Sequence, residues 1–187
     1  MPPLFVLTGP SGAGKSTVLA RLVADPPVPF QRFVTTTTRQ PRLGETNGRD
    51  YWFVTRETFE RELATDNFFE WAEVYGNYYG SNKNEMYRLQ ALDQPIVVIL
   101  DVQGARAIKR LRPDACAIYI DAPKAELVER MSGRKVSEAE IARRTEQLAT
   151  EESFRAEADV VVLNKNGELE QTIERVRNEI KTRTKGA

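Results

Sequence analysis

The feature that most constrains the fold is a glycine-rich loop between an apolar segment and a helical segment. The apolar segment LFVLT (4–8) predicts a buried strand, and a helix is predicted over residues 15–24. Glycine is costly in backbone entropy, so the loop GPSGAGKS (9–16) indicates a bound group that the backbone must approach closely. A strand, a glycine-rich loop and a helix in this order are typical of a phosphate-binding site.

The loop also fits the complete P-loop pattern G-x-x-x-x-G-K-[ST]. Its backbone N–H groups can turn inward at the start of the helix and form a cradle for an anion. In this pattern Lys15 supplies a positive charge to the β- and γ-phosphates, and the Ser16 hydroxyl can ligate Mg²⁺. The alternative, a glycine-rich turn that binds nothing, does not account for the complete pattern. The residues predicted to bind ATP here are Gly9, Pro10, Ser11, Gly12, Ala13, Gly14, Lys15, Ser16 and Thr17.

Buried strands alternate with helical segments along most of the chain. The predicted strands are residues 4–8, 95–101, 116–121 and 158–164. The predicted helices are residues 15–24, 105–111, 125–131 and 168–181. Because apolar runs of this kind are buried on both faces, the pattern predicts an α/β fold with a central parallel sheet covered by helices.

Composition excludes several kinds of chemistry. The chain has no histidine, and its one cysteine, Cys116, lies in an apolar run, so His-based catalysis, internal disulfides and cysteine zinc clusters are excluded. Lys and Arg together number 27, as do Asp and Glu, so no net charge draws the protein to nucleic acid or to a membrane. No run approaches the ~18 apolar residues of a membrane span, and we expect no signal peptide because the start lacks its basic segment. We expect a cytoplasmic protein of 187 residues with no nucleic-acid or membrane partner.

Residues 35–93 differ from the rest of the chain in their pattern of apolar residues. Their apolar runs are short, alternating and aromatic (YWFV, NFFEWAEV, NYYGS), which predicts a small antiparallel insert. One helix is predicted within it over residues 56–64, with Thr55 as its N-cap. A second irregular segment, MSGRKVSE, precedes a helix that begins at Ser137, because Ser137 and Glu140 have the spacing of a capping box.

The insert carries side chains suited to a second phosphate. Arg39 and Arg42 lie three residues apart in a loop, and two guanidinium groups that converge can hold a doubly charged phosphate through paired hydrogen bonds. Tyr51 and Tyr79 offer hydroxyl groups to the same anion. Each of these residues alone is more often a solvated or packing residue, so the prediction depends on the whole set.

Glu70 and Ser81 match the hydrogen-bonding edge of guanine. A carboxylate accepts two hydrogen bonds from adjacent N–H groups, and a hydroxyl donates one to a carbonyl oxygen. Guanine presents N1–H and the 2-amino group as donors and O6 as acceptor. Adenine would leave a buried Glu70 charged and unpaired, which is costly.

Asp101 follows the predicted strand at residues 95–101 and admits two interpretations. It either caps the next helix or binds the water shell of a metal ion. Beside a P-loop the metal interpretation is favoured. We therefore predict a Mg²⁺ site, largely through water, at Ser16 and Asp101.

The sequence resembles the guanylate kinase family over essentially its whole length. The matching stretches, in chain order, are GPSGAGKST, TTRQPRLGETNGRDYWFV, FFEWAEVYGNYYGS, LDVQGA, RMSGR and ARR. The resemblance implies a single-domain, three-layer P-loop kinase fold and the transfer of the γ-phosphoryl group of ATP to GMP. It implies a core of residues 1–34, 94–129 and 145–187, a GMP-binding insert of residues 35–93 and a lid of residues 130–144.

The resemblance also implies roles for particular residues. Those implied to bind the GMP phosphate are Arg39, Arg42, Tyr51 and Tyr79. Those implied to contact guanine are Thr35, which stands where the family often has Ser, together with Glu70 and Ser81. The implied catalytic residues are Lys15, Arg39 and the lid arginines Arg130, Arg134 and Arg144, of which Arg130 and Arg134 also bind ATP. Asn164 matches an asparagine that lies near the adenine of ATP.

The chain departs from the family pattern in three places. Ile99 stands where the family commonly has an acidic residue that touches the guanine amino group, so selectivity for guanine depends more on Glu70. The lid is one residue shorter than usual, with Lys135 in place of a glycine, and the last strand ends in NKN (164–166).

Two alternatives stay open at this point. One is a kinase for another purine monophosphate, such as dGMP, IMP or a modified base, and it is motivated by Ile99. The other is a non-catalytic guanylate kinase-like module that binds proteins, although such modules typically lose the P-loop and arginine residues that this chain keeps. Either a monomer or a homodimer fits the sequence.

Overall fold

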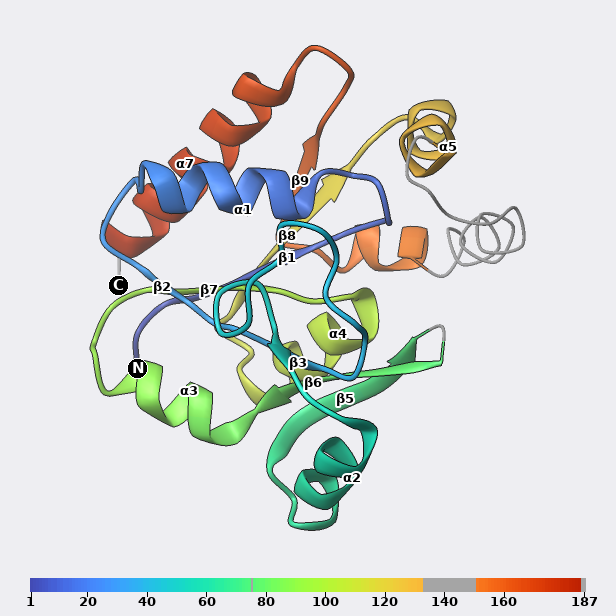
Figure 1. The fold of residues 1–187 in the computed structure, drawn as a ribbon. Coiled ribbons are helices and arrows are strands. Elements are labelled where there is room, and N and C mark those ends of the chain that lie inside the picture. Colours follow the sequence, from blue (N-terminus) through green and yellow to red (C-terminus); the bar gives the residue numbers. More distant parts are fainter. Residues whose placement is uncertain (75, 133–150, 186–187) are drawn as a thin grey trace.

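In this computed structural model, residues 1–74, 76–132 and 151–185 are described. A five-stranded sheet forms the centre, with the strand order β2-β7-β1-β8-β9 (Figure 1). All neighbouring strands in it are parallel, as predicted. The strands are β1 (Leu4–Thr8), β2 (Gln31–Arg32), β7 (Ile96–Ile99), β8 (Cys116–Asp121) and β9 (Val160–Leu163).

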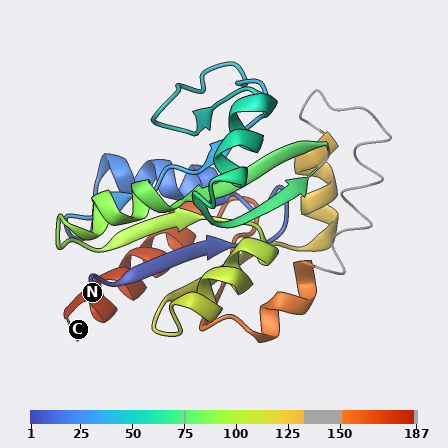
Figure 2. The same ribbon diagram turned by 90° about the horizontal axis from the view of Figure 1, so that it is seen from below.

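Helices cover both faces of this sheet (Figures 1 and 2). The helices α1 (Lys15–Ala24) and α7 (Leu169–Lys185) bury their apolar residues on one face. On the other face lie α4 (Val102–Leu111), α3 (Lys83–Gln90) and the short helix η1 (Phe154–Ala156). Successive residues of β1 point alternately into the two cores, which is why its sequence is apolar throughout.

The insert forms a second sheet of four strands in the order β4-β3-β6-β5. Its strands are β3 (Thr36–Thr37), β4 (Trp52–Phe53), β5 (Phe68–Val74) and β6 (Asn77–Asn82). The prediction of an antiparallel insert is wrong at one pair, because β3 and β4 run parallel. The long loop between these two strands brings the chain back to the same end of the sheet, which a short hairpin turn would not allow.

The insert also contains two helices where one was predicted. The helix α2 (Arg56–Ala64) begins after Thr55, whose side chain accepts a hydrogen bond from the Thr58 backbone N–H, as expected. The second helix, α3, begins after Asn82, whose side chain accepts from Asn84 N. Asn82 and Glu85 have the spacing of a capping box, so the sequence did carry a signal for it.

Other differences from the predicted elements are small. The helix α4 begins at Val102 rather than at residue 105, because Asp101 caps it. The two-residue strand β2 was not predicted, since so short a segment shows no periodicity. Beyond these, α5 spans Lys124–Ser132, and Cys116 is buried in β8 as predicted. The expected capping box at Ser137 and Glu140 lies outside the described residues.

No helix in the described part of the chain is both long enough and apolar enough to cross a membrane.

Candidate active site

A cavity of about 340 Å³ lies between the P-loop and the insert. It opens at the carboxyl ends of the neighbouring strands β1 and β7, where ligands bind in open α/β sheets. Lining residues from the core include Gly9, Ser11, Lys15, Ile99 and Asp101. Lining residues from the insert include Thr35, Arg42, Tyr51, Glu70 and Tyr79. Eight of the residues predicted from the sequence to contact one or other nucleotide, Lys15 and Arg42 among them, thus line one cavity.

The P-loop has a backbone conformation that favours glycine at three positions, of which Gly9 and Gly14 are the most crowded. Gly9 and Gly14 have positive φ angles of 128° and 97°, which residues with a Cβ rarely adopt. A Cβ at Gly9 would also lie 2.1 Å from the carbonyl oxygen of Ile120, and one at Gly14 would lie 2.5 Å from Nδ2 of Asn164. The loop therefore wraps tightly against the ends of β8 and β9.

Lys15 lies across the P-loop at the start of α1. Its Nζ donates to the carbonyl oxygens of Gly9 and Pro10 at 2.6 and 2.9 Å. The first turn of α1 exposes Ser16 and Thr17 beside it. The ammonium group is thus held at the helix N-terminus, where the helix dipole adds to its positive field.

Arg130 of α5 reaches the same loop from the far side. Its guanidinium donates to the carbonyl oxygens of Gly12 at 3.4 Å and Asn164 at 2.9 Å. Glu126, one helical turn earlier, accepts from it at 2.7 Å and holds it in place. The other two predicted lid arginines, Arg134 and Arg144, lie outside the described residues, as does Lys135.

Asn164 is more deeply buried than a nucleotide contact would require, with 4% of its surface exposed. Its Nδ2 donates to the carbonyl oxygen of Ala13 at 2.8 Å, and its Oδ1 accepts from the Thr172 hydroxyl at 3.2 Å. The side chain therefore ties the P-loop to α7, a role that the sequence did not predict. The contact of Asn164 with adenine stays a prediction, and in this structure its amide is hydrogen-bonded to Ala13 and Thr172 instead.

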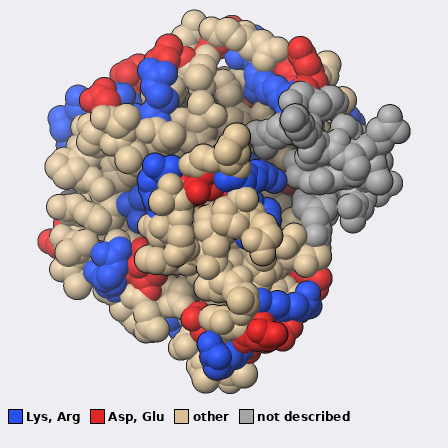
Figure 3. Space-filling view, in the orientation of Figure 1, with Lys and Arg blue, Asp and Glu red and all other residues tan. Residues whose placement is uncertain are grey.

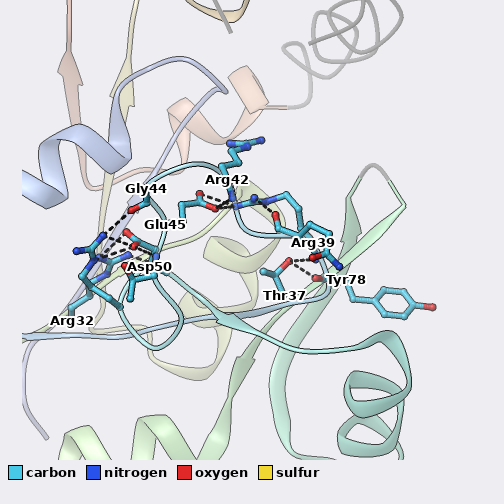
Figure 4. A network of polar contacts seen from close by, with 11 residues as sticks. Arg32, Thr37, Arg39, Arg42, Gly44, Glu45, Asp50 and Tyr78 are labelled. Atoms are coloured by element: carbon cyan, nitrogen blue, oxygen red, sulfur yellow. Dashed lines mark hydrogen bonds and ion pairs between the residues drawn. The ribbon is translucent and has the colours of Figure 1, made fainter. Parts of the chain in front are cut away.

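The loop that joins β3 and β4 carries both predicted phosphate-binding arginines, and Figure 4 shows how acidic side chains hold it. Glu45 accepts hydrogen bonds from Arg39 Nη2 at 2.9 Å on both carboxylate oxygens, and from the Arg42 backbone N–H at 2.7 Å. Asp50 accepts from the Thr46 backbone N–H at 2.8 Å, and its own carbonyl oxygen accepts from Arg32 of the core at 3.0 Å. Basic and acidic atoms accordingly lie in contact over this loop in Figure 3.

Glu45 and Asp50 were missed in the sequence. The segment RLGETNGRD alternates basic and acidic residues within a loop, a pattern that could have indicated internal ion pairs.

The two arginines have different surroundings. Arg42 is exposed, lines the cavity and points away from Glu45 (Figure 4). Arg39 keeps only 13% of its side chain exposed and lies over the rings of Tyr51 and Phe53, 5.4 and 5.7 Å from their centroids. Burial works against the charge of Arg39, but the hydrogen bond to Glu45, the charge of Glu45 and the nearby Tyr79 together outweigh it and raise the pKa of Arg39. Arg42 is therefore placed to meet a ligand in the cavity, whereas Arg39 is placed to support the loop.

Tyr51, Tyr79 and Thr35 all line the cavity, and their contacts with GMP stay a prediction. The rings of Tyr51 and Tyr79 meet edge to face, 6.0 Å apart, and both line the cavity. Thr35, the first residue of the insert, also lines the cavity and is 8% exposed. An anion near these hydroxyls would also face the guanidinium of Arg42.

Glu70 and Ser81 are cross-strand partners on β5 and β6. The Ser81 hydroxyl, which is 1% exposed, donates to Glu70 Oε1 at 2.5 Å, so Ser81 lies behind the carboxylate rather than on the cavity wall. The pKa of Glu70 is raised to about 7. Burial is the largest cause, the hydrogen bond from Ser81 partly opposes it, and the nearby charge of Asp101 adds to it. Ile99 lines the same end of the cavity and offers no hydrogen-bonding group.

Asp101 caps α4, which confirms the first of the two interpretations given from the sequence. Its Oδ1 accepts from the Gly104 backbone N–H at 2.8 Å. The metal interpretation stays a prediction, and the residues present fit it: the exposed Ser16 hydroxyl and the Asp101 carboxylate follow neighbouring strands at one edge of the sheet. No group of three or more potential metal ligands of the His, Cys, Asp and Glu types occurs among the described residues. Mg²⁺, which keeps several waters and takes few carboxylates, suits such a sparse donor set.

A parallel sheet with a P-loop after its central strand, and an insert that faces this loop across a cavity, define a P-loop kinase. The sequence model described as guanylate kinase matches residues 1–183, and the chain therefore belongs to the guanylate kinase family. The resemblance found in the sequence and the predicted fold are confirmed.

Curated relatives and solved structures agree with this membership. The chain is 44% identical to the guanylate kinase of Shewanella violacea over 165 residues, which cover 86% of this chain and 79% of the relative. It is 38% identical to that of Chlamydia trachomatis over 165 residues, covering 87% and 80%. The crystal structure of guanylate kinase from Anaplasma phagocytophilum superposes with a TM-score of 0.77 at 28% identity, covering 98% of this chain and 86% of that one. Shikimate kinase from Bacteroides thetaiotaomicron shares the fold alone, with a TM-score of 0.52 at 15% identity over 96% of this chain and 98% of that one.

Proposed function

We propose that this protein transfers the γ-phosphoryl group of ATP to GMP and releases ADP and GDP. One observation carries the proposal: Lys15 of the P-loop and Arg42 and Glu70 of the insert line a single cavity. Two nucleotides bound from opposite sides of such a cavity would meet with their phosphates together. Membership of the guanylate kinase family and the names of the relatives point to the same pair of substrates.

On the donor side, the P-loop would hold the phosphates of ATP. Inward N–H groups and the N-terminus of α1 favour negative charge there. Lys15, now bonded to two loop carbonyl oxygens, would turn to the β- and γ-phosphates when ATP enters. Arg130, held by Glu126 next to the loop, would add a second positive charge.

On the acceptor side, the insert would hold GMP. Arg42, Tyr51 and Tyr79 line the part of the cavity suited to the phosphate, and Arg39 would keep the loop that carries Arg42 and Tyr51 in place through Glu45. The Glu70 carboxylate would accept from guanine N1–H and the 2-amino group. Thr35 would donate to O6, and Ser81 would act through Glu70.

The reaction itself requires no protein base. An oxygen of the GMP phosphate is already an anion, so it attacks the γ-phosphorus while the bond to the ADP oxygen breaks. The absence of histidine from the chain is compatible with this chemistry. What the residues must do is align the two nucleotides, balance their negative charge and keep out water that would hydrolyse ATP.

Mg²⁺ is the proposed cofactor, held near Ser16 and Asp101. When bound, it would neutralise charge on the β- and γ-phosphate oxygens. Asp101 would face it through water with the oxygen that does not cap α4.

The proposed setting is purine nucleotide metabolism in the cytoplasm, where ATP and GMP are both available.

The test is a panel of acceptors. ADP formation with ATP would be followed for GMP, dGMP, IMP and AMP, each with and without Mg²⁺, and the phosphorylated product identified. We expect the highest kcat/KM with GMP, a smaller value with IMP and almost none with AMP. ADP formation that is equal with and without any monophosphate would mean that the protein hydrolyses ATP instead, and the proposal would fail. A preference for IMP over GMP would reassign the acceptor.

A further inference from the structure

Gly104, in the first turn of α4, lies directly beside the Glu70 carboxylate. A Cβ on Gly104 would be 3.0 Å from Glu70 Oε2 and 3.2 Å from Glu70 Cδ, closer than nearly all real Cβ contacts. The carboxylate would therefore have to move by a few tenths of an ångström to make room for the methyl group of an alanine. The two residues lie this close because α4 of the core packs against β5 of the insert, where Glu70 lies.

The conformation of Gly104 does not explain why glycine is there. Gly104 is helical and is not among the residues with positive φ, so its backbone is open to alanine. Alanine would also favour the helix, since glycine is among the weakest helix formers. The remaining reason is space, and Glu70 and Leu100 supply the atoms that fill it.

The opposite side of the carboxylate is fixed by the insert. Ser81 donates to Glu70 Oε1, and Ser81 is itself buried. The pairing of β5 with β6 is irregular between Phe68 and Glu70, and such bulges commonly redirect a side chain beside an active site. The carboxylate is therefore held by a hydroxyl on one side and given room by a glycine on the other.

We propose that Gly104 is a positioning residue that sets the affinity for the guanine base by leaving space for the Glu70 carboxylate. The inference rests on the proposed function, in which Glu70 accepts hydrogen bonds from guanine. It adds a residue of the core helix to a base site whose hydrogen-bonding side chains come from the insert.

The first test is Gly104→Ala. We expect the KM for GMP to rise about tenfold, because a methyl group displaces the carboxylate from a charge-assisted hydrogen bond. The KM for ATP and the kcat at saturating GMP should change by no more than about twofold, and the preference for GMP over AMP should fall. The melting temperature should not drop below that of the parent protein, because alanine favours the helix. A variant whose KM for GMP equals the parent's would overturn the inference.

A double-mutant cycle separates positioning from general damage. In a Glu70→Ala protein there is no carboxylate to displace, so adding Gly104→Ala should leave the KM for GMP where Glu70→Ala alone puts it. If the two effects multiply instead, Gly104 acts by another route and the inference is wrong. Arg110→Ala is the matched control, because it adds an alanine to an exposed position of the same helix, away from the cavity.

The same cycle distinguishes this inference from the proposed function. If Glu70→Ala alone leaves the KM for GMP unchanged, the proposed base contact fails. If Glu70→Ala raises it and Gly104→Ala does not, only the role of Gly104 fails.

Discussion

The two ends of the cavity are built in different ways. The P-loop end is formed by one contiguous segment, residues 9–16, and its anion cradle consists of backbone N–H groups with one lysine. The insert end is formed by side chains from separate segments, among them Arg42, Glu70 and Tyr79, which meet because the four strands of the insert pair into one sheet. A backbone site tolerates little change in shape, whereas a side-chain site depends on its supports.

Those supports are visible throughout the insert end. Arg39 and Arg42 are both bound to Glu45, Asp50 is tied to Arg32 of the core, and Glu70 is held by Ser81. From this difference we expect that substitution of a single residue is enough to abolish function at the P-loop end. At the insert end, residues that never touch a nucleotide should matter as well.

The largest expected effect is at the P-loop end. Lys15→Met should lower kcat by about 10³-fold, because the charge that stabilises the transferring phosphoryl group is lost. The melting temperature should change far less than the rate, since Lys15 lines the cavity and water can replace its hydrogen bonds to the two loop carbonyl oxygens. Steady-state ADP release and a thermal melt provide the measurements. Lys181→Met, at an exposed position of α7, is the control. If Lys15→Met lowers kcat by less than about tenfold, the P-loop end does not depend on a single residue as we expect.

The next effect separates the two arginines of the insert end. Arg42→Ala should raise the KM for GMP by about 10- to 100-fold, the range for a lost hydrogen bond to a charged group, without lowering the melting temperature. Arg39→Ala should impair GMP binding as well. It should also reduce the free energy of unfolding by about 1–3 kcal/mol, because the Glu45 carboxylate loses its hydrogen bonds from the Arg39 guanidinium. The burial of Arg39 over the ring of Tyr51 is a further reason to expect this loss of stability.

Saturation curves for GMP and thermal melts distinguish these outcomes, with Arg110→Ala on exposed α4 surface as the control. Equal melting temperatures for the Arg39 and Arg42 variants would remove the distinction between a ligand-facing and a supporting arginine.

The smallest effect concerns the pH dependence of GMP binding. With the pKa of Glu70 at about 7, the ionised fraction falls from about nine-tenths at pH 8 to about one-tenth at pH 6, so the KM for GMP should rise about tenfold. Glu70→Gln should give a higher KM that lacks this component. Because GMP itself titrates in the same range, the two proteins must be compared with the same nucleotide.

The stability of the protein should increase as pH falls, whereas its affinity for GMP should decrease. A carboxyl whose folded pKa lies above its unfolded value binds its proton more tightly in the folded state. Glu70 should therefore add to the free energy of unfolding as pH falls from above 7 toward 4.5, by up to about 3 kcal/mol. Chemical denaturation at pH 8 and pH 6 measures this, and a Glu70→Gln protein with the same pH dependence as the parent would contradict the shifted pKa.

Much of this protein was determined by local sequence. The strand Leu4–Thr8, the helices Lys15–Ala24 and Arg56–Ala64, and the P-loop were predicted with their observed bounds, because apolar runs, capping residues and glycine positions act over a few neighbouring residues. The parallel central sheet followed from the alternation of such runs with helices.

Only the tertiary structure decided how the insert is assembled. The parallel pairing of β3 with β4, the ion pairs of Glu45 and Asp50, and the burial of Asn164 against the P-loop all join residues that are separate in the chain. The contact between Gly104 and Glu70 is of the same kind. Local patterns specify elements because their energies are local, whereas the position of a side chain in a cavity depends on the packing of every element around it.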